Sequence, residues 1–81
     1  MLDVQLSGLL QDAAGGAACV AVDASTIREL LRKLIERYPD MQSRVDEGVA
    51  VSINGEIYRD NWREPIPQDA EVFLMPRIQG G

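Results

Sequence analysis

The chain has 81 residues, which is enough for one small hydrophobic core but not for a second. Hydrophobic residues make up 46% and charged residues 26%, a balance typical of a soluble globular domain rather than a disordered chain. The net charge of −5 disfavours nucleic acid as a partner, because phosphates attract clusters of Lys and Arg, and makes a basic protein surface the more natural partner. Solubility alone also selects for such a charge.

Missing residue types exclude several kinds of site. The chain has no His, so it lacks the usual general base near neutral pH. Its one cysteine, Cys19, excludes zinc and iron–sulfur sites that need several Cys or His ligands. No Gly-rich phosphate loop of the G-x-x-x-x-G-K type is present. We therefore expect no catalytic residue, no metal site and no bound cofactor, and not an autonomous enzyme.

The sequence also favours a cytoplasmic location. No apolar run approaches the roughly 20 residues that span a bilayer. The N-terminus lacks the basic and apolar regions of a secretory signal. A single cysteine cannot form an intrachain disulfide, which agrees with a reducing compartment.

The first third of the chain is predicted to form two antiparallel strands. Residues 2–6 alternate apolar and polar side chains, the pattern of a half-buried strand. Residues 8–18 are rich in Gly and Ala, and we expect them to be the turn region of a hairpin. A second strand follows and runs to about Asp23.

Cys19 falls on this second strand, opposite in phase to Val20 and Val22. A reactive thiol usually has a His or Lys nearby, and none is close in the sequence. We therefore favour an inert, buried or half-buried cysteine over a reactive one.

The clearest element is a helix that begins after Thr26. Thr26 and Glu29 match the capping box, in which each side chain accepts a hydrogen bond from a free backbone N–H of the first turn. Pro39 ends the helix near Arg37 or Tyr38. One apolar stripe of period 3.6 is formed by Ile27, Leu30, Leu31, Leu34 and Ile35.

A second hairpin follows the helix. Residues 40–48 are polar and are expected to be a loop, or a short helical turn that carries Met41 and Val45 inward. Residues 49–53 alternate as a strand, and Asn54-Gly55 is the strongest short signal for a type I′ turn. The returning strand begins at residues 57–58.

Residues 60–71 are predicted to be a long surface connection in which Trp62 or Ile66 packs down as an anchor. Residues 72–75 form the last strand. Pro76 has no N–H to donate, so regular pairing should stop there or the residue should lie at an edge.

This order of elements predicts an α+β domain. One main helix must cover one face of a mixed sheet of four to five strands in order to bury its stripe. We expect the first and last strands to lie side by side in the middle. The folded domain would span residues 1–76, and residues 77–81 would be a flexible tail.

Phe73 and Met75 are candidates for a protein-docking patch. If Val72 and Leu74 face the helix, Phe73 and Met75 point to the other face of the sheet, where the neighbouring strands carry small or polar residues. The alternatives are that a loop covers both side chains, or that the phase is wrong by one residue, which would exchange the faces.

The tail ends in Gly80-Gly81. Glycine has no Cβ, so such a backbone can enter a narrow channel and leaves its terminal carboxylate unshielded. Five extended residues reach roughly 17 Å, enough to place that carboxylate inside a partner's active site. The alternative is a frayed terminus without a function.

The whole chain resembles the MoaD/ThiS family of sulfur carrier proteins in the order and length of its elements. The resemblance is carried by the hairpin of residues 51–56, the strand entry of residues 69–72 and the ending of residues 74–81. It implies a ubiquitin-like β-grasp fold. It also implies that an ATP-dependent activating enzyme adenylates the carboxylate of Gly81, which then becomes a thiocarboxylate, while Arg77, Ile78, Gln79 and Gly80 enter the partner's active site.

Within this family the chain most resembles the small subunit of molybdopterin synthase, which implies the synthase large subunit as a second partner. Arg77 and Gln79 depart from that branch, whose tail often has Pro and a small residue there. Sulfur carriers for cysteine, thiamine or siderophore biosynthesis share the fold and the ending. A ubiquitin-like interaction or conjugation module without sulfur chemistry is the remaining alternative.

Overall fold

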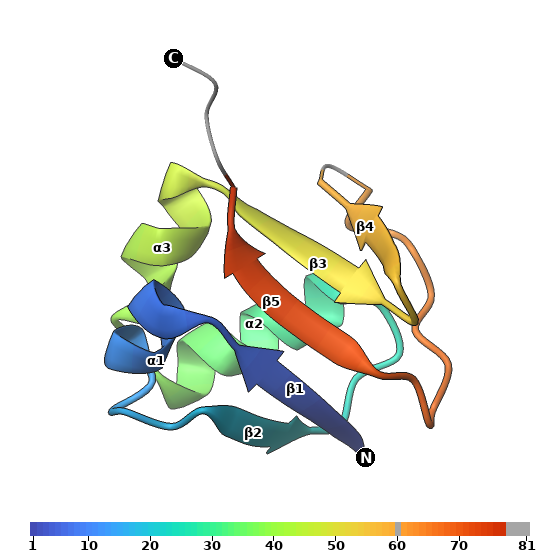
Figure 1. The fold of residues 1–81 in the computed structure, drawn as a ribbon, viewed down its shortest axis with the longest axis horizontal. Coiled ribbons are helices and arrows are strands. Elements are labelled where there is room, and N and C mark those ends of the chain that lie inside the picture. Colours follow the sequence, from blue (N-terminus) through green and yellow to red (C-terminus); the bar gives the residue numbers. More distant parts are fainter. Residues whose placement is uncertain (60, 78–81) are drawn as a thin grey trace.

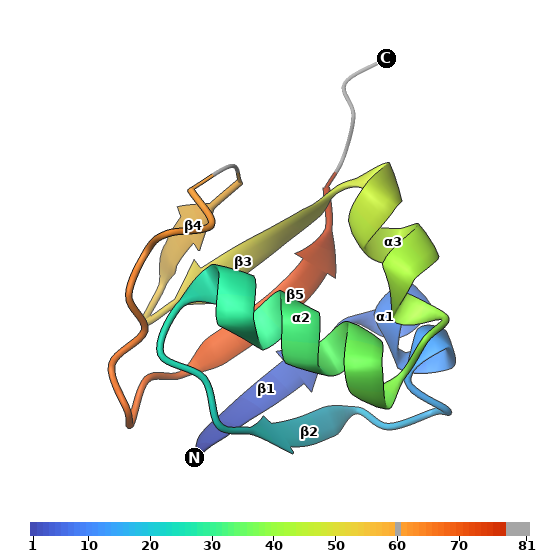
Figure 2. The ribbon, with the colours of Figure 1, turned by 180° about the vertical axis from the view of Figure 1, so that it is seen from behind.

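The computed structural model describes residues 1–59 and 61–77, which form one mixed sheet with helices packed on one of its faces (Figures 1 and 2). The elements in chain order are β1 (Leu2–Leu6), α1 (Gly8–Ala13), β2 (Cys19–Val22), α2 (Ile27–Arg37), α3 (Met41–Glu47), β3 (Val49–Ile53), β4 (Glu56–Tyr58) and β5 (Val72–Pro76).

The five strands lie in the order β2-β1-β5-β3-β4, so the first and last strands are neighbours near the middle of the sheet, as the sequence predicts. β1 and β5 run parallel, with Val4 beside Val72 and Leu6 beside Leu74. The other three pairs are antiparallel. The α+β class and the mixed sheet are therefore confirmed, with five strands.

α2 lies across one face of the sheet (Figure 2) and begins as predicted. The Thr26 hydroxyl accepts a hydrogen bond from the Glu29 N–H at 3.2 Å. The Glu29 carboxylate, however, accepts from the N–H of Ser25 at 2.8 Å, one residue earlier than the usual capping box. The helix ends at Arg37, and its stripe is buried except for Ile35, which is half-buried.

The expectation that residues 8–18 form only a turn is wrong, because they contain α1. The Ser7 carbonyl accepts hydrogen bonds from the N–H groups of Leu10 and Gln11, which starts the helix. Leu10 is buried and holds the helix against the core. Gly15 and Gly16, at φ of 68° and 89°, then reverse the chain toward β2. The glycine pair makes the reversal, but a helix precedes it.

Residues 41–47 also form a helix, α3, rather than a loop. The alternative of a short helical turn was the better one: Met41 is fully buried and Val45 is half-buried. Gly48, at φ of 114°, ends the helix. α1 and α3 pack against each other, close to the point where β5 ends (Figure 2).

The second hairpin and the long connection follow the predictions with small differences. Asn54 and Gly55 have φ of 50° and 89°, as a type I′ turn requires. In the connection, Ile66 is buried and Trp62 is half-buried. The Glu64 and Trp62 carbonyls accept hydrogen bonds from the first N–H groups of α2. β5 extends one residue further than predicted, because Pro76 still pairs with Val49.

Candidate functional site

One face of the sheet is left uncovered by the helices, and we call it the open face (Figure 1). A single row of five residues, one from each strand, crosses this face from one edge strand to the other. Each member of the row is paired with the next one in the neighbouring strand. The members of this row are Cys19, Gln5, Phe73, Ser52 and Ile57.

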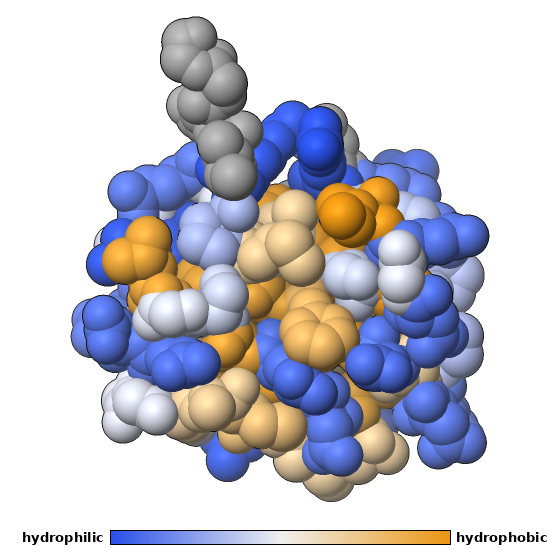
Figure 3. Space-filling model, viewed as in Figure 1, coloured by the Kyte–Doolittle hydropathy of each residue, from blue (hydrophilic) through white to orange (hydrophobic). Residues whose placement is uncertain are grey.

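Phe73 and Met75 lie on the open face, in the phase that the sequence predicts. Val72 and Leu74 are buried toward α2, whereas Phe73 is 37% exposed and Met75 is half-buried. No segment of residues 1–59 or 61–77 hides Phe73, so neither the covering loop nor the shifted phase applies to it. Figure 3 shows hydrophobic side chains gathered near the centre of this face and hydrophilic ones around them.

Ile57 belongs with these two side chains, although the sequence analysis did not single it out. It is 56% exposed and pairs with Ser52, the residue that also pairs with Phe73. Its alternation with Glu56 and Tyr58 was the available signal. We call Ile57, Phe73 and Met75 the apolar patch.

The tail begins at the rim of this face. The Arg77 N–H donates to the Gly48 carbonyl at 3.0 Å, which continues the pairing of β5 with the β3 side. A cavity of about 530 Å³ lies beside this point, lined by Leu9, Gly48 and Arg77 among others. The predicted tail residues Ile78, Gln79, Gly80 and Gly81 lie outside the described residues.

Among residues 1–59 and 61–77, two titratable groups have shifted pKa values, and in each the first cause is a local hydrogen bond. The backbone N–H of Ser25 lowers the pKa of Glu29, with help from the Ser25 hydroxyl. The hydrogen bond that the Tyr58 hydroxyl donates to Glu56, at 2.7 Å, raises the pKa of Tyr58 to about 12.

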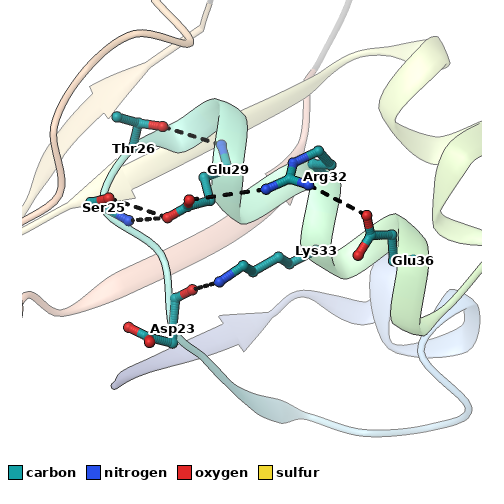
Figure 4. A network of polar contacts seen from close by, with 7 residues as sticks. All are labelled: Asp23, Ser25, Thr26, Glu29, Arg32, Lys33 and Glu36. Atoms are coloured by element: carbon teal, nitrogen blue, oxygen red, sulfur yellow. Dashed lines mark hydrogen bonds and ion pairs between the residues drawn. The ribbon is translucent and has the colours of Figure 1, made fainter.

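Glu29 belongs to a surface network (Figure 4) of Asp23, Ser25, Thr26, Glu29, Arg32, Lys33 and Glu36. Its ion pairs are exposed, so they contribute little to stability.

Comparison with known protein families matches residues 4–81 to the ThiS family. The chain belongs to the ThiS family. This is a family of ubiquitin-like sulfur carriers and modifiers, so the resemblance stated from the sequence is confirmed. A search of curated protein sequences found no match.

Solved structures agree with the β-grasp fold of this ThiS-family chain. Small archaeal modifier protein 1 (SAMP1) of Haloferax volcanii is 28% identical, with a TM-score of 0.77, and the match covers 99% of this chain and 98% of that one. A putative molybdopterin converting factor subunit 1 of Pyrococcus furiosus is 18% identical, with a TM-score of 0.79 and coverage of 95% and 97%. The BexX/CysO complex of Amycolatopsis orientalis matches at 17% identity and a TM-score of 0.80, with both chains covered completely.

In this ThiS-family chain Cys19 is exposed, which corrects the expectation of a buried or half-buried residue. It lies on the open face, but on an edge strand with a neighbour on one side only. Among residues 1–59 and 61–77, no group of three Cys, Asp or Glu side chains could hold a metal ion. Over the same residues, no helix has the length and apolar character needed to cross a bilayer.

Proposed function

We propose that this chain is a sulfur carrier whose Gly81 carboxylate is adenylated and then converted to a thiocarboxylate. The observation that carries the proposal is the family match, which extends from residue 4, within β1, to Gly81. The matched range includes the diglycine, which supports a functional terminus over an incidental one.

The proposed chemistry needs no catalytic group on the carrier. An oxygen of the Gly81 carboxylate attacks the α-phosphorus of ATP on the activating enzyme, and pyrophosphate leaves. A hydrosulfide equivalent then attacks the acyl carbon, so a C–S bond forms, the C–O bond to AMP breaks, and AMP leaves with the electron pair. We propose that the chain is not an enzyme and binds no cofactor itself, since ATP is held by its partner. We also propose that the chain works in the cytoplasm, where ATP is available to the activating enzyme.

The carrier contributes recognition and reach. In our proposal Phe73 and Met75, joined by Ile57, dock on the activating enzyme and on the enzyme that accepts the sulfur. Arg77, Ile78, Gln79 and Gly80 enter the partner's active site, and their extended length of roughly 13–14 Å would carry Gly81 there. The geometry supports this arrangement because β5, which bears two residues of the apolar patch, leads directly into the tail.

Molybdopterin biosynthesis is the pathway that we favour, with the synthase large subunit as the sulfur acceptor. The similarity to the Pyrococcus protein named as a molybdopterin converting factor supports it at the level of fold. The similarity to CysO in its complex with BexX is of the same order, so the fold does not separate the pathways, and cysteine, thiamine and siderophore biosynthesis are the rivals. Feeding the thiocarboxylated chain to each acceptor enzyme in turn should release sulfur to one of them only.

A role as a protein modifier is the second candidate, favoured by the 28% identity to SAMP1. In that case the activated Gly81 carboxyl would be attacked by a lysine amine instead of sulfide. Peptide mapping of cell extracts would then find lysines carrying the C-terminal residues of this chain, and a variant lacking Gly81 would abolish them.

Pyrophosphate exchange tests the shared first step. With ATP and the adenylating enzyme encoded in the same genome, the unaltered chain should support exchange of labelled pyrophosphate into ATP, and the chain without Gly81 should not. Exchange that is absent with every adenylating enzyme of that genome, or that does not require Gly81, would contradict the proposal.

A further inference from the structure

Charges on the open face are separated along the direction of β5. Where β5 begins, a hollow of about 290 Å³ is lined by three carboxylate residues, Asp3, Asp69 and Glu71, which outnumber the one cationic group there, the amino group of Met1. Where β5 ends and the tail begins, a hollow of about 220 Å³ is lined by the cationic residues Arg59 and Arg77. The cavity of about 530 Å³ shares Pro76 and Arg77 with it but is also lined by Arg44, Asp46 and Glu47, so the excess of positive charge is confined to the smaller hollow. Of the apolar patch, Phe73 lies between the two hollows, while Ile57 and Met75 line the hollow at the tail end.

The hollow at the tail end has an apolar wall and a cationic rim. Ala50, Ile57 and Met75 line it, and Met75 pairs directly with Ala50 across β3 and β5. Arg59 is exposed, and within the described residues it makes no ion pair. An exposed guanidinium beside an apolar hollow favours an apolar side chain flanked by carboxylates.

The net charge of −5 does not reveal that acidic and cationic residues lie at opposite ends of β5. It predicts only that a partner should be basic. The local charges predict a different partner surface at each end of β5. A basic surface fits the carboxylates at the start of β5, but it would be repelled by Arg59 at the tail end.

We propose that the activating enzyme docks on the open face. It places an apolar side chain in the hollow at Ile57 and Met75, carboxylates around the mouth that receives the tail, and basic residues at the far end. This inference rests on the proposed function for the existence of such a partner. The two opposite charges allow one orientation of the carrier along β5 and oppose the reversed one, in which the tail would point away from the mouth.

Charge reversals with matched controls test the inference. The probe is the adenylating enzyme encoded in the same genome, and association is followed by stopped-flow fluorescence at low and high salt. Arg59→Glu should slow association on the order of tenfold at low salt, with the difference shrinking at high salt as the charges are screened. Arg28→Glu makes the same change on the exposed side of α2 and should have little effect.

The acidic end is tested in the same way. Glu71→Lys should also slow association, whereas Asp12→Lys, on α1, should not. Thermal unfolding of each variant checks that the fold is kept. If Arg59→Glu matches Arg28→Glu or speeds association while pyrophosphate exchange by the unaltered chain is normal, the charge polarity is wrong and the proposed function stands. If the unaltered chain supports no exchange, the proposed function fails and this inference fails with it.

Discussion

Tyr58 stands at the end of β4, and its hydroxyl donates a 2.7 Å hydrogen bond to the carboxylate of Glu56. That bond holds the proton on the phenol, and burial and the negative charge of Glu56 add to the effect. The folded-state pKa is thus raised from 10.0 to about 12. The stabilisation is fully present below pH 10 and is lost as the pH rises through about 12.

Replacing Glu56 by Gln should move the Tyr58 titration midpoint from about 12 back toward 10.0, because the carboxylate is the largest cause of the shift. Phenolate absorbance measured in a Tyr38→Phe background reports Tyr58 alone. A midpoint that is the same with Glu56 and with Gln would show that the hydrogen bond does not hold the proton.

Residue exposure on the open face is the part of the site that the sequence predicts least well. The face of the sheet to which a side chain points follows from the alternation of side chains along a strand. This is why the sequence places Phe73 and Met75 on the right face. Exposure depends on the neighbouring strands, and strand order is set by pairing between distant segments. Ser52 in the interior strand β3 is thus 7% exposed, while Cys19 on the edge strand β2 is exposed, although both face the same way.

At the scale of elements, the sequence predicts those whose local signals agree. α2 has a cap, an apolar stripe and a terminating proline, and the second hairpin has Asn54-Gly55. α1 has none of these: its Ser7 makes no side-chain cap, and its only buried residues are Leu10 and Ala13. Two anchors in a segment rich in Gly and Ala are too few to distinguish a short helix from a turn, so tertiary packing decides.

α2 also closes the free edge of β2. The Ala18 carbonyl faces β1, where it accepts from the Leu6 N–H, so by alternation the Ala21 and Asp23 carbonyls point away from the sheet. Arg37 donates to the Ala21 carbonyl at 3.0 Å, and Lys33 donates to that of Asp23. Four helical residues rise about 6 Å, close to the spacing of alternate strand residues, which lets both cations reach.

Removing these two cations should expose the β2 edge to pairing with a second copy of the chain. We expect Lys33→Ala/Arg37→Ala to self-associate at concentrations where the unaltered chain does not, as measured by sedimentation velocity. Arg28→Ala/Arg32→Ala removes the same charge from the same helix without touching β2. Equal association of both double variants would assign the effect to net charge instead of to the edge.

At the scale of the molecule, we propose separate tasks for the two faces of the sheet. The face under α2 forms one continuous core with fully buried members such as Val4, Leu34 and Val72. The open face presents the apolar patch, and the tail starts at the end of β5, at the edge of this face. Stability and docking should therefore be separable by substitution.

Leu34→Ala should lower the free energy of unfolding by about 2–5 kcal/mol, because Leu34 is fully buried and its removal leaves a cavity. Phe73→Arg should cost only about 1 kcal/mol, the centre of the range for point substitutions, because Phe73 is partly exposed, while it weakens binding to the activating enzyme. Urea denaturation measures the first quantity, and titration calorimetry measures the second. Equal loss of stability in both variants, or unchanged binding by Phe73→Arg, would contradict the division of tasks.

We propose above all that Gly81 carries sulfur, and intact mass measurement tests this most directly. After incubation with ATP, the activating enzyme and sulfide, the chain should gain the mass difference between one sulfur and one oxygen atom. Fragmentation should locate that gain at Gly81, and the variant without Gly81 should show none. Two results would contradict the claim. One is an unchanged mass under conditions in which pyrophosphate exchange shows that adenylation occurs, and the other is a mass gain located at Cys19 instead of Gly81.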